Sequence, residues 1–259
     1  GILNKIDTHC HLLPDVDDGP SSMAESLELA SVLAQLGFTE VIATPHYIDD
    51  YSEKYRSHIY QQYKTLQAAL EAEGIPLRVH LGGEIMLSFE VEKQASEGTL
   101  PVLSSQKHVL LEFPLQQEVL AFAAQVIFHL QIKGYQPIIA HPERVNFIKD
   151  DPDCLTRFFH SGVLLQINAG SLLGLYGRRA KKTAQYLLQR QMVHFVATDS
   201  HSADFARRLQ QLTQLPYPWK QLLSDNPHSL LNNGIIRANK QEKVGLAKFF
   251  SFTNSLLGR

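Results

Sequence analysis

Cysteine is scarce in this chain, with only Cys10 and Cys154 among 259 residues. Two cysteines cannot form the disulfide framework that stabilises small secreted domains, and they are typical of a protein from a reducing compartment. The sequence also begins without the charged and apolar segments of a signal peptide. We therefore expect a cytoplasmic protein.

An excess of charge of one sign is also missing. The chain has 24 Lys and Arg against 26 Asp and Glu, which gives a formal net charge of −2 at pH 7. Binding to nucleic acid or to an anionic membrane surface usually requires a marked basic excess, so we expect neither partner. No apolar stretch approaches the ~20 residues of a membrane-spanning helix, so we expect a protein that is not embedded in a membrane.

The chain does contain a series of short apolar runs with helical patterns between them. Runs that are nearly uninterrupted are typical of strands buried on both faces, and seven occur at residues 2–6, 40–44, 78–81, 107–111, 137–140, 163–167 and 194–197. Helices are predicted over about residues 21–34, 52–73, 118–133, 153–160 and 179–190, and an amphipathic helix after residue 238. This alternation indicates one α/β domain over residues 1–259, with a parallel sheet that is most simply closed into a barrel.

Residues of the kind that bind metal ions lie at six of the seven predicted strand ends. In a parallel barrel these ends meet at one rim. Imidazole and carboxylate groups bind Zn, Mn or Fe without a thiolate, and burying so many of them without partners would cost several kcal/mol each. We therefore predict a hydrolytic metal centre formed by His9, His11, Asp18, His46, Glu84, Glu112, His141, Asp199 and His201. Asp17 adjoins Asp18, and only one of the two need bind.

Other residues of similar type are better explained without a metal. Cys10 alternates with two predicted ligands along a strand, so its side chain points the opposite way and is expected to pack in the core. The basic run 178–182 is expected to begin a solvated helix, with a substrate contact as the alternative. Surface or core positions away from the rim are expected for His58, His80, His108, His129, His160, His194 and His228.

Several short motifs carry a resemblance to a known family, namely His9-x-His11, Asp18-Gly19, Thr44-Pro45-His46, Gly83-Glu84, His141-Pro142-Glu143-Arg144 and Asp199-x-His201. They are similar to those of the polymerase-and-histidinol-phosphatase (PHP) superfamily. Further phrases resemble its bacterial protein-tyrosine phosphatase branch, the CpsB/CapC type found with capsule and exopolysaccharide genes. These phrases include Leu111-Glu112-Phe113-Pro114 and Asn168-Ala169-Gly170-Ser171.

The resemblance implies a fold and a set of ions. The fold is a distorted seven-stranded (β/α) barrel of the TIM-like kind, and it holds up to three ions, usually manganese and sometimes iron or zinc. Glu84 is implied to be catalytic, because it bridges two of these ions. The implied ligand sets are His9, His11, Glu84 and Asp199 for one ion, Glu84, Glu112 and His141 for the second, and Asp18, His46 and His201 for the third.

The resemblance also implies a substrate. Arg144 would be catalytic and bind the substrate phosphate, and Arg207 or Arg208 would supply a second phosphate contact. Of these two, Arg207 is the predicted one. The implied reaction is hydrolysis of phosphotyrosine in a protein, namely an autophosphorylated bacterial tyrosine kinase that regulates polysaccharide export. A covalent cysteine route is not expected, because neither cysteine has an arginine six positions later.

Three alternatives remain open at this point. The first is a small-molecule phosphatase of the histidinol-phosphate type. The second is a phosphodiesterase or nuclease, against which the near-neutral charge and the lack of an aromatic, basic groove count. The third is a metal-binding interaction module without catalysis, against which the intact ligand set and Arg144 count.

Overall fold

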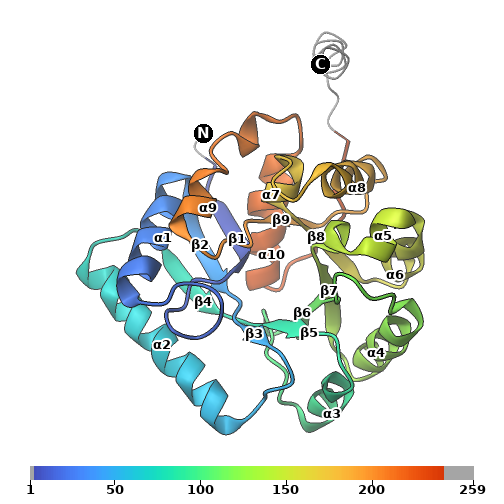
Figure 1. Cartoon of the computed structure of the whole chain (residues 1–259), viewed down its shortest axis with the longest axis horizontal. Coiled ribbons are helices and arrows are strands. Elements are labelled where there is room, and N and C mark those ends of the chain that lie inside the picture. Colours follow the sequence, from blue (N-terminus) through green and yellow to red (C-terminus); the bar gives the residue numbers. More distant parts are fainter. Residues whose placement is uncertain (1–2, 242–259) are drawn as a thin grey trace.

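The strands lie around the middle of the molecule, with most helices outside them (Figure 1). This computed structural model describes residues 3–241. All paired strands are parallel, in one sheet of order β1-β2-β4 and another of order β3-β5-β6-β7-β8-β9. The strands are β1 (Lys5–Cys10), β2 (Phe38–Ala43), β3 (His46–Tyr47), β4 (Arg78–Leu81), β5 (Glu84–Met86), β6 (His108–Glu112), β7 (Gln136–Ala140), β8 (Leu164–Asn168) and β9 (Phe195–Ala197).

The helices alternate with the strands along the chain, as predicted. Three of them begin at serine caps. The hydroxyls of Ser22, Ser52 and Ser202 accept hydrogen bonds from the backbone N–H groups three residues later, those of Glu25, Tyr55 and Phe205. The helices are α1 (Met23–Gln35), α2 (Glu53–Ala72), α3 (Glu90–Glu97), α4 (Leu120–Ile132), α5 (Asn146–Asp150), α6 (Thr156–His160), α7 (Ala169–Leu172), α8 (Arg178–Gln189), α9 (Ala203–Arg207) and α10 (Asn226–Leu231).

The prediction of one closed barrel of seven strands is not confirmed. The described strands number nine, in two sheets of which neither is closed. The chain passes from the first sheet to the second twice, between β2 and β3 at Thr44-Pro45 and between β4 and β5 at Gly82-Gly83. Proline has no N–H for a strand ladder, and a Cβ on Gly83 would lie 2.7 Å from the Pro101 ring. An isolated parallel bridge also pairs Cys10, the last residue of β1, with Ser200, which follows β9 in the chain.

Some predicted boundaries are wrong. The first strand begins at Lys5 and continues to Cys10, so His9 lies within β1 rather than after it. The helix predicted at 153–160 is divided into a 3-10 turn, Pro152–Leu155, and α6. Helices α3, α5, α7, α9 and α10 were not predicted. Most of the helix predicted after residue 238 lies outside the described residues.

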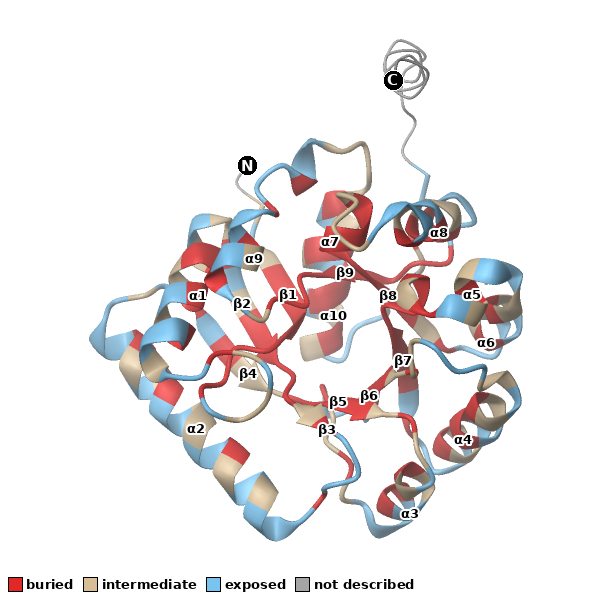
Figure 2. Cartoon of the chain, viewed as in Figure 1, coloured by how far each residue is buried: buried red, intermediate tan, exposed pale blue. Residues whose placement is uncertain are grey.

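Each strand has one face toward the helices and one toward the interior, which explains the apolar runs. On β7, Ile139 joins the large core cluster under the helices, whereas Ile138 and Ala140 join a smaller inner cluster. Leu230 of α10 belongs to this inner cluster, and α10 lies behind the middle of the strands in Figure 1. The strands are therefore buried on both sides (Figure 2).

Candidate metal centre

The nine predicted ligands come together at the carboxyl ends of the strands. His9 lies in β1, His46 begins β3, Glu84 begins β5 and Glu112 ends β6. The others lie in the segments that follow β1, β7 and β9, namely His11, Asp18, His141, Asp199 and His201. Three overlapping groups have ligand atoms within 4.8 Å of one another, and they contain eight of the nine residues, all but His141.

The most deeply buried group contains His9, His11, Glu84 and Asp199. The Nε2 atoms of His9 and His11 lie 3.2 Å apart. Glu84 Oε2 lies 3.2 and 3.1 Å from these two nitrogens. Asp199 Oδ1 lies 3.2 and 3.4 Å from the same pair. Two atoms bonded at 2.0–2.2 Å to one ion are themselves about 3–3.5 Å apart, so this spacing fits a shared cation.

The hydrogen bonding of these atoms supports the same interpretation. Glu84 Oε2 and Asp199 Oδ1 are buried, and neither has a hydrogen-bond partner within residues 3–241. A buried carboxylate oxygen without a partner costs several kcal/mol. A divalent cation among the four ligand atoms would satisfy both oxygens, so the donor set fits a metal.

A second group is formed by His46, Glu84 and Glu112. His46 Nδ1 lies 3.1 Å from Glu84 Oε2 and 3.6 Å from Glu112 Oε2. His141 Nε2 lies 3.0 Å from Glu84 Oε1 and 3.9 Å from Glu112 Oε1. The sequence prediction put His141 with the two glutamates. The structure brings His46 there as well, because its two ring nitrogens face two different groups.

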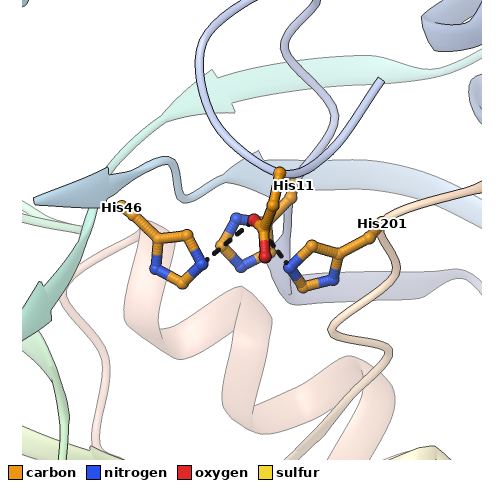
Figure 3. Close-up of side chains that lie close together, drawn as sticks. His11, His46 and His201 are labelled. Atoms are coloured by element: carbon orange, nitrogen blue, oxygen red, sulfur yellow. Dashed lines mark ion pairs between the residues drawn. The ribbon is translucent and has the colours of Figure 1, made fainter. Parts of the chain in front are cut away.

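The third group is the most open one. Asp18 Oδ1 lies 3.2 Å from His46 Nε2 and 3.2 Å from His201 Nε2. Figure 3 shows the rings of His11, His46 and His201 gathered together, with these two ion pairs dashed. The Asp18 side chain is 67% exposed, so solvent and substrate can reach this side of the centre.

A layer of polar groups orients the candidate ligands, and most of this layer was not predicted from the sequence. Asp17 Oδ2 lies 2.9 Å from His11 Nδ1 and accepts the backbone N–H of His46. The Gln166 side-chain amide lies 2.8 Å from His9 Nδ1. Such contacts on the far ring nitrogen fix the ring and its tautomer. Asp17 was noted in the sequence as the neighbour of Asp18, and Gln166 could have been noted as a polar residue within an apolar strand.

The electrostatics of the centre shift the pKa values of its buried groups in both directions. Burial alone would raise the pKa of Glu84, but the surrounding histidines hold it well below its usual value. Burial would lower the pKa of His141, but Glu84 and other carboxylates raise it to about 9. The pKa of Glu112 is raised by burial and by the Glu84 charge. Bound cations would supply positive charge beside these carboxylates, and they would bind the imidazoles in their neutral form.

Arg144 lies beside this centre in the 3-10 turn Pro142–Arg144. Its Nη1 donates to Asp199 Oδ2 at 3.4 Å, and its guanidinium stacks on the Tyr176 ring at 4.1 Å. Asn168 Nδ2 donates to the same carboxylate oxygen at 2.8 Å. The three contacts hold a planar cation at the edge of the candidate ligands.

The predicted second arginine lies in a different environment. Arg207 forms ion pairs with Glu28 of α1 and with Asp204, both at 2.6 Å. Arg207 and Arg208 are both exposed. A phosphate-binding role for either residue stays a prediction.

The remaining candidates occupy the core and surface positions that the sequence indicated. Cys10 is completely buried, and burial raises the pKa of its thiol well above the usual value. His108 and His194 are buried, and His80 pairs with Glu40 at 2.6 Å. Arg178 begins α8, and Arg179 pairs with Asp150.

The family is decided by sequence comparison. The model of the CpsB/CapC family of capsular polysaccharide synthesis matches residues 5–216. The chain belongs to this family. It is 34% identical to the tyrosine-protein phosphatase YwqE of Bacillus subtilis over 257 residues, which is 95% of this chain and 99% of that protein. It is 31% identical to the putative tyrosine-protein phosphatase CapC of Staphylococcus aureus, over 85% of this chain and 82% of that one.

Solved structures support the same placement. A crystal structure from work on YwqE of Bacillus subtilis and CpsB of Streptococcus pneumoniae, described as unique metal-dependent tyrosine phosphatases, superposes with a TM-score of 0.77. It is 32% identical and covers 92% of this chain and 100% of its own. The histidinol phosphate phosphatase of Lactococcus lactis, with a TM-score of 0.53 and 14% identity over 82% of this chain and 93% of its own, shares the fold. No helix within residues 3–241 is long and apolar enough to cross a membrane.

Proposed function

We propose that the protein is a metal-dependent phosphatase that hydrolyses phosphotyrosine in proteins. The observation that carries the proposal is a pair of buried oxygens, Glu84 Oε2 and Asp199 Oδ1, that have no hydrogen-bond partner within residues 3–241. They face the Nε2 atoms of His9 and His11, and Arg144 lies beside them. The family relatives named as tyrosine-protein phosphatases support the substrate class.

The nine candidate ligands would hold up to three divalent ions, for which manganese is our first choice and iron or zinc the alternatives. His9, His11, Glu84 and Asp199 would hold one, and Glu84 would be shared with a second one beside Glu112, His141 and His46. Asp18, His46 and His201, with His11 beside them, would hold the third. When bound, the ions would supply an activated water and positive charge for the phosphoryl oxygens.

The protein's own contribution to the reaction is to position the phosphate. Arg144 presents parallel N–H groups that can bind two phosphoryl oxygens at once, a geometry that lysine cannot copy. Its stacking on Tyr176 and its contact with Asp199 hold the guanidinium in place before the substrate arrives. The leaving phenolate has a pKa of about 10, so a modest contribution from a general acid suffices.

Sequence identity and the position of Arg144 rank the alternative functions. Identity is 34% to a tyrosine-protein phosphatase but 14% to the histidinol phosphate phosphatase, which favours phosphotyrosine over histidinol phosphate. A binding module without catalysis would not need an arginine beside the ligands. Within the family context, we propose that the substrate is an autophosphorylated tyrosine kinase of capsule or exopolysaccharide synthesis, in the cytoplasm.

Metal removal tests the proposal. Protein purified without chelator is expected to contain more than one equivalent of Mn, Fe or Zn by elemental analysis. A chelator should abolish hydrolysis of a phosphotyrosine peptide, and Mn²⁺ should restore it, because the centre supplies the nucleophile. Histidinol phosphate and a phosphodiester, assayed alongside, should be hydrolysed more slowly.

Cys10→Ser serves as the matched control, because the buried thiol takes no part in the proposed chemistry. This variant should keep most of its activity. Full activity in metal-free protein would overturn the metal-dependent reaction, and preference for histidinol phosphate would overturn the substrate class.

A further inference from the structure

A cavity of about 240 Å³ opens beside Arg144. Its walls come from the segments after β6, β7 and β8, at the same strand ends as the candidate metal centre. The first two segments are joined by a backbone hydrogen bond from Asn146 N to Leu115 O at 2.8 Å. The lining consists of Leu115, Gln116, Arg144, Asn146, Lys149 and Tyr176.

The charged residues that line this cavity are both cations. Arg144 and Lys149 both line it, and its lining contains no carboxylate. Lys149 has no ion pair within the described part of the chain, whereas the neighbouring Asp150 is paired with Arg179. Burial lowers the pKa of Lys149, and Arg179 and Arg144 lower it further, whereas the Asp150 carboxylate opposes this shift. Cations that crowd together in this way are stabilised when an anion joins them.

We propose that this cavity binds an anionic group of the substrate other than the phosphate that is hydrolysed, and that Lys149 recognises it. The proposal rests on the proposed phosphotyrosine phosphatase activity and adds a specificity site to it. The anion would be the carboxylate of an acidic residue near the phosphotyrosine, or the phosphate of a second phosphotyrosine.

The two cations have different surroundings, which separates their roles. Arg144 is held toward the centre by Asp199 Oδ2 and by the Tyr176 ring. Because one face of that ring is already covered by the guanidinium, and most of the lining is polar, the cavity suits an anion better than the aryl group of the substrate. Lys149, which has no carboxylate partner within residues 3–241, is the cation available to such an anion.

The test compares four substrates with the metal-loaded full chain. They are a phosphotyrosine peptide with Asp or Glu on both sides, the same peptide with Asn or Gln, a version with a second phosphotyrosine, and p-nitrophenyl phosphate. Lys149→Met should lower kcat/KM about tenfold on the anionic peptide that uses the cavity, the loss expected for one charge-assisted contact. Turnover of the neutral peptide and of p-nitrophenyl phosphate should not change, which also shows that the variant is folded.

Two further variants complete the design. Lys149→Arg should keep the preference for the anionic peptide, because the charge remains. Lys182→Met is the matched control, since it removes the same charge from an exposed position of α8 outside the cavity lining. If the peptide with Asp or Glu loses turnover in Lys149→Met, the anion is a carboxylate. If the peptide with a second phosphotyrosine loses turnover, the anion is a phosphate.

Three results would overturn the proposal: equal losses on all four substrates, no loss on either anionic peptide, or the same loss from Lys182→Met. A wild-type protein that hydrolyses none of the four would instead contradict the proposed function, and the specificity site with it.

Discussion

The role of Arg144 can be separated from that of the candidate metal ligands, because Arg144 lies beside them and is not itself a ligand. Arg144→Ala should keep its metal content while losing phosphotyrosine turnover. Removing one charge-assisted donor to the transition state typically costs about 10²–10³ in rate. Arg144→Lys should recover little, because a point charge does not reproduce two parallel N–H groups. Steady-state kinetics and elemental analysis of the same samples measure both effects.

Arg179→Ala provides the control for this prediction, since Arg179 is an exposed arginine paired with Asp150. It should leave both quantities unchanged. Wild-type kinetics in Arg144→Ala with its metals in place would mean that the phosphate binds elsewhere.

Residue type and position along the strands were enough to predict which side chains gather at the centre. They were not enough for the residues that orient them. Gln166 contacts His9 from 157 positions away, and Asn168 reaches Asp199 across neighbouring strands. Such contacts depend on strand register, which a single sequence does not fix.

At the scale of elements, the apolar runs predicted where the strands lie but not where they break. Pro45 lies between β2 and β3, and Gly82 and Gly83 lie between β4 and β5. Local patterns favoured one strand in each place. The packing of Gly83 against Pro101 and Tyr47 leaves no room for a side chain there, a constraint from distant segments that the local pattern does not contain. Helix α10 was missed because its six residues are too few for a periodic pattern.

Helix α10 nevertheless contributes to the inner core, which gives a prediction about stability. Leu230 is completely buried in the inner cluster beside Ile42, Leu110 and Phe195. Leu230→Ala should lower the free energy of unfolding by about 2–5 kcal/mol, because it removes apolar contacts and leaves a cavity. Urea denaturation checks this value. Ile235→Ala, at a side chain that is 73% exposed, should change it little, and equal effects would place Leu230 outside the core.

Across the whole molecule, the interior has two layers along the strands. Apolar residues such as Ile138 and Phe195 fill one layer, toward α10. Histidines and carboxylates fill the other, at the carboxyl ends. The first layer anchors the strands, and the second concentrates polar groups that only cations or ion pairs can satisfy. The sequence predicted strands buried on both faces and a rim of ligand-type residues, but not the packing against α10. Whether the strands close into one ladder depends on packing between distant segments.

The pH dependence of unfolding tests how the buried histidines outside the centre contribute to stability. His194 is buried, its Nδ1 accepts the backbone N–H of Leu165, and burial lowers its pKa from 6.5 to about 4. Below pH 6.5 the unfolded chain binds a proton that the folded protein does not accept until about pH 4, so stability falls as the pH drops through this window. Between about pH 7 and pH 5 this one histidine should lower the free energy of unfolding by about 2 kcal/mol.

His194→Asn, whose side-chain oxygen can still accept the Leu165 N–H, should lose that share of the pH dependence relative to wild type. His160→Asn, at an exposed position, should keep it. Urea denaturation of the three proteins at both pH values measures the difference, and parallel pH profiles for wild type and His194→Asn would show that His194 does not stay neutral in the folded protein.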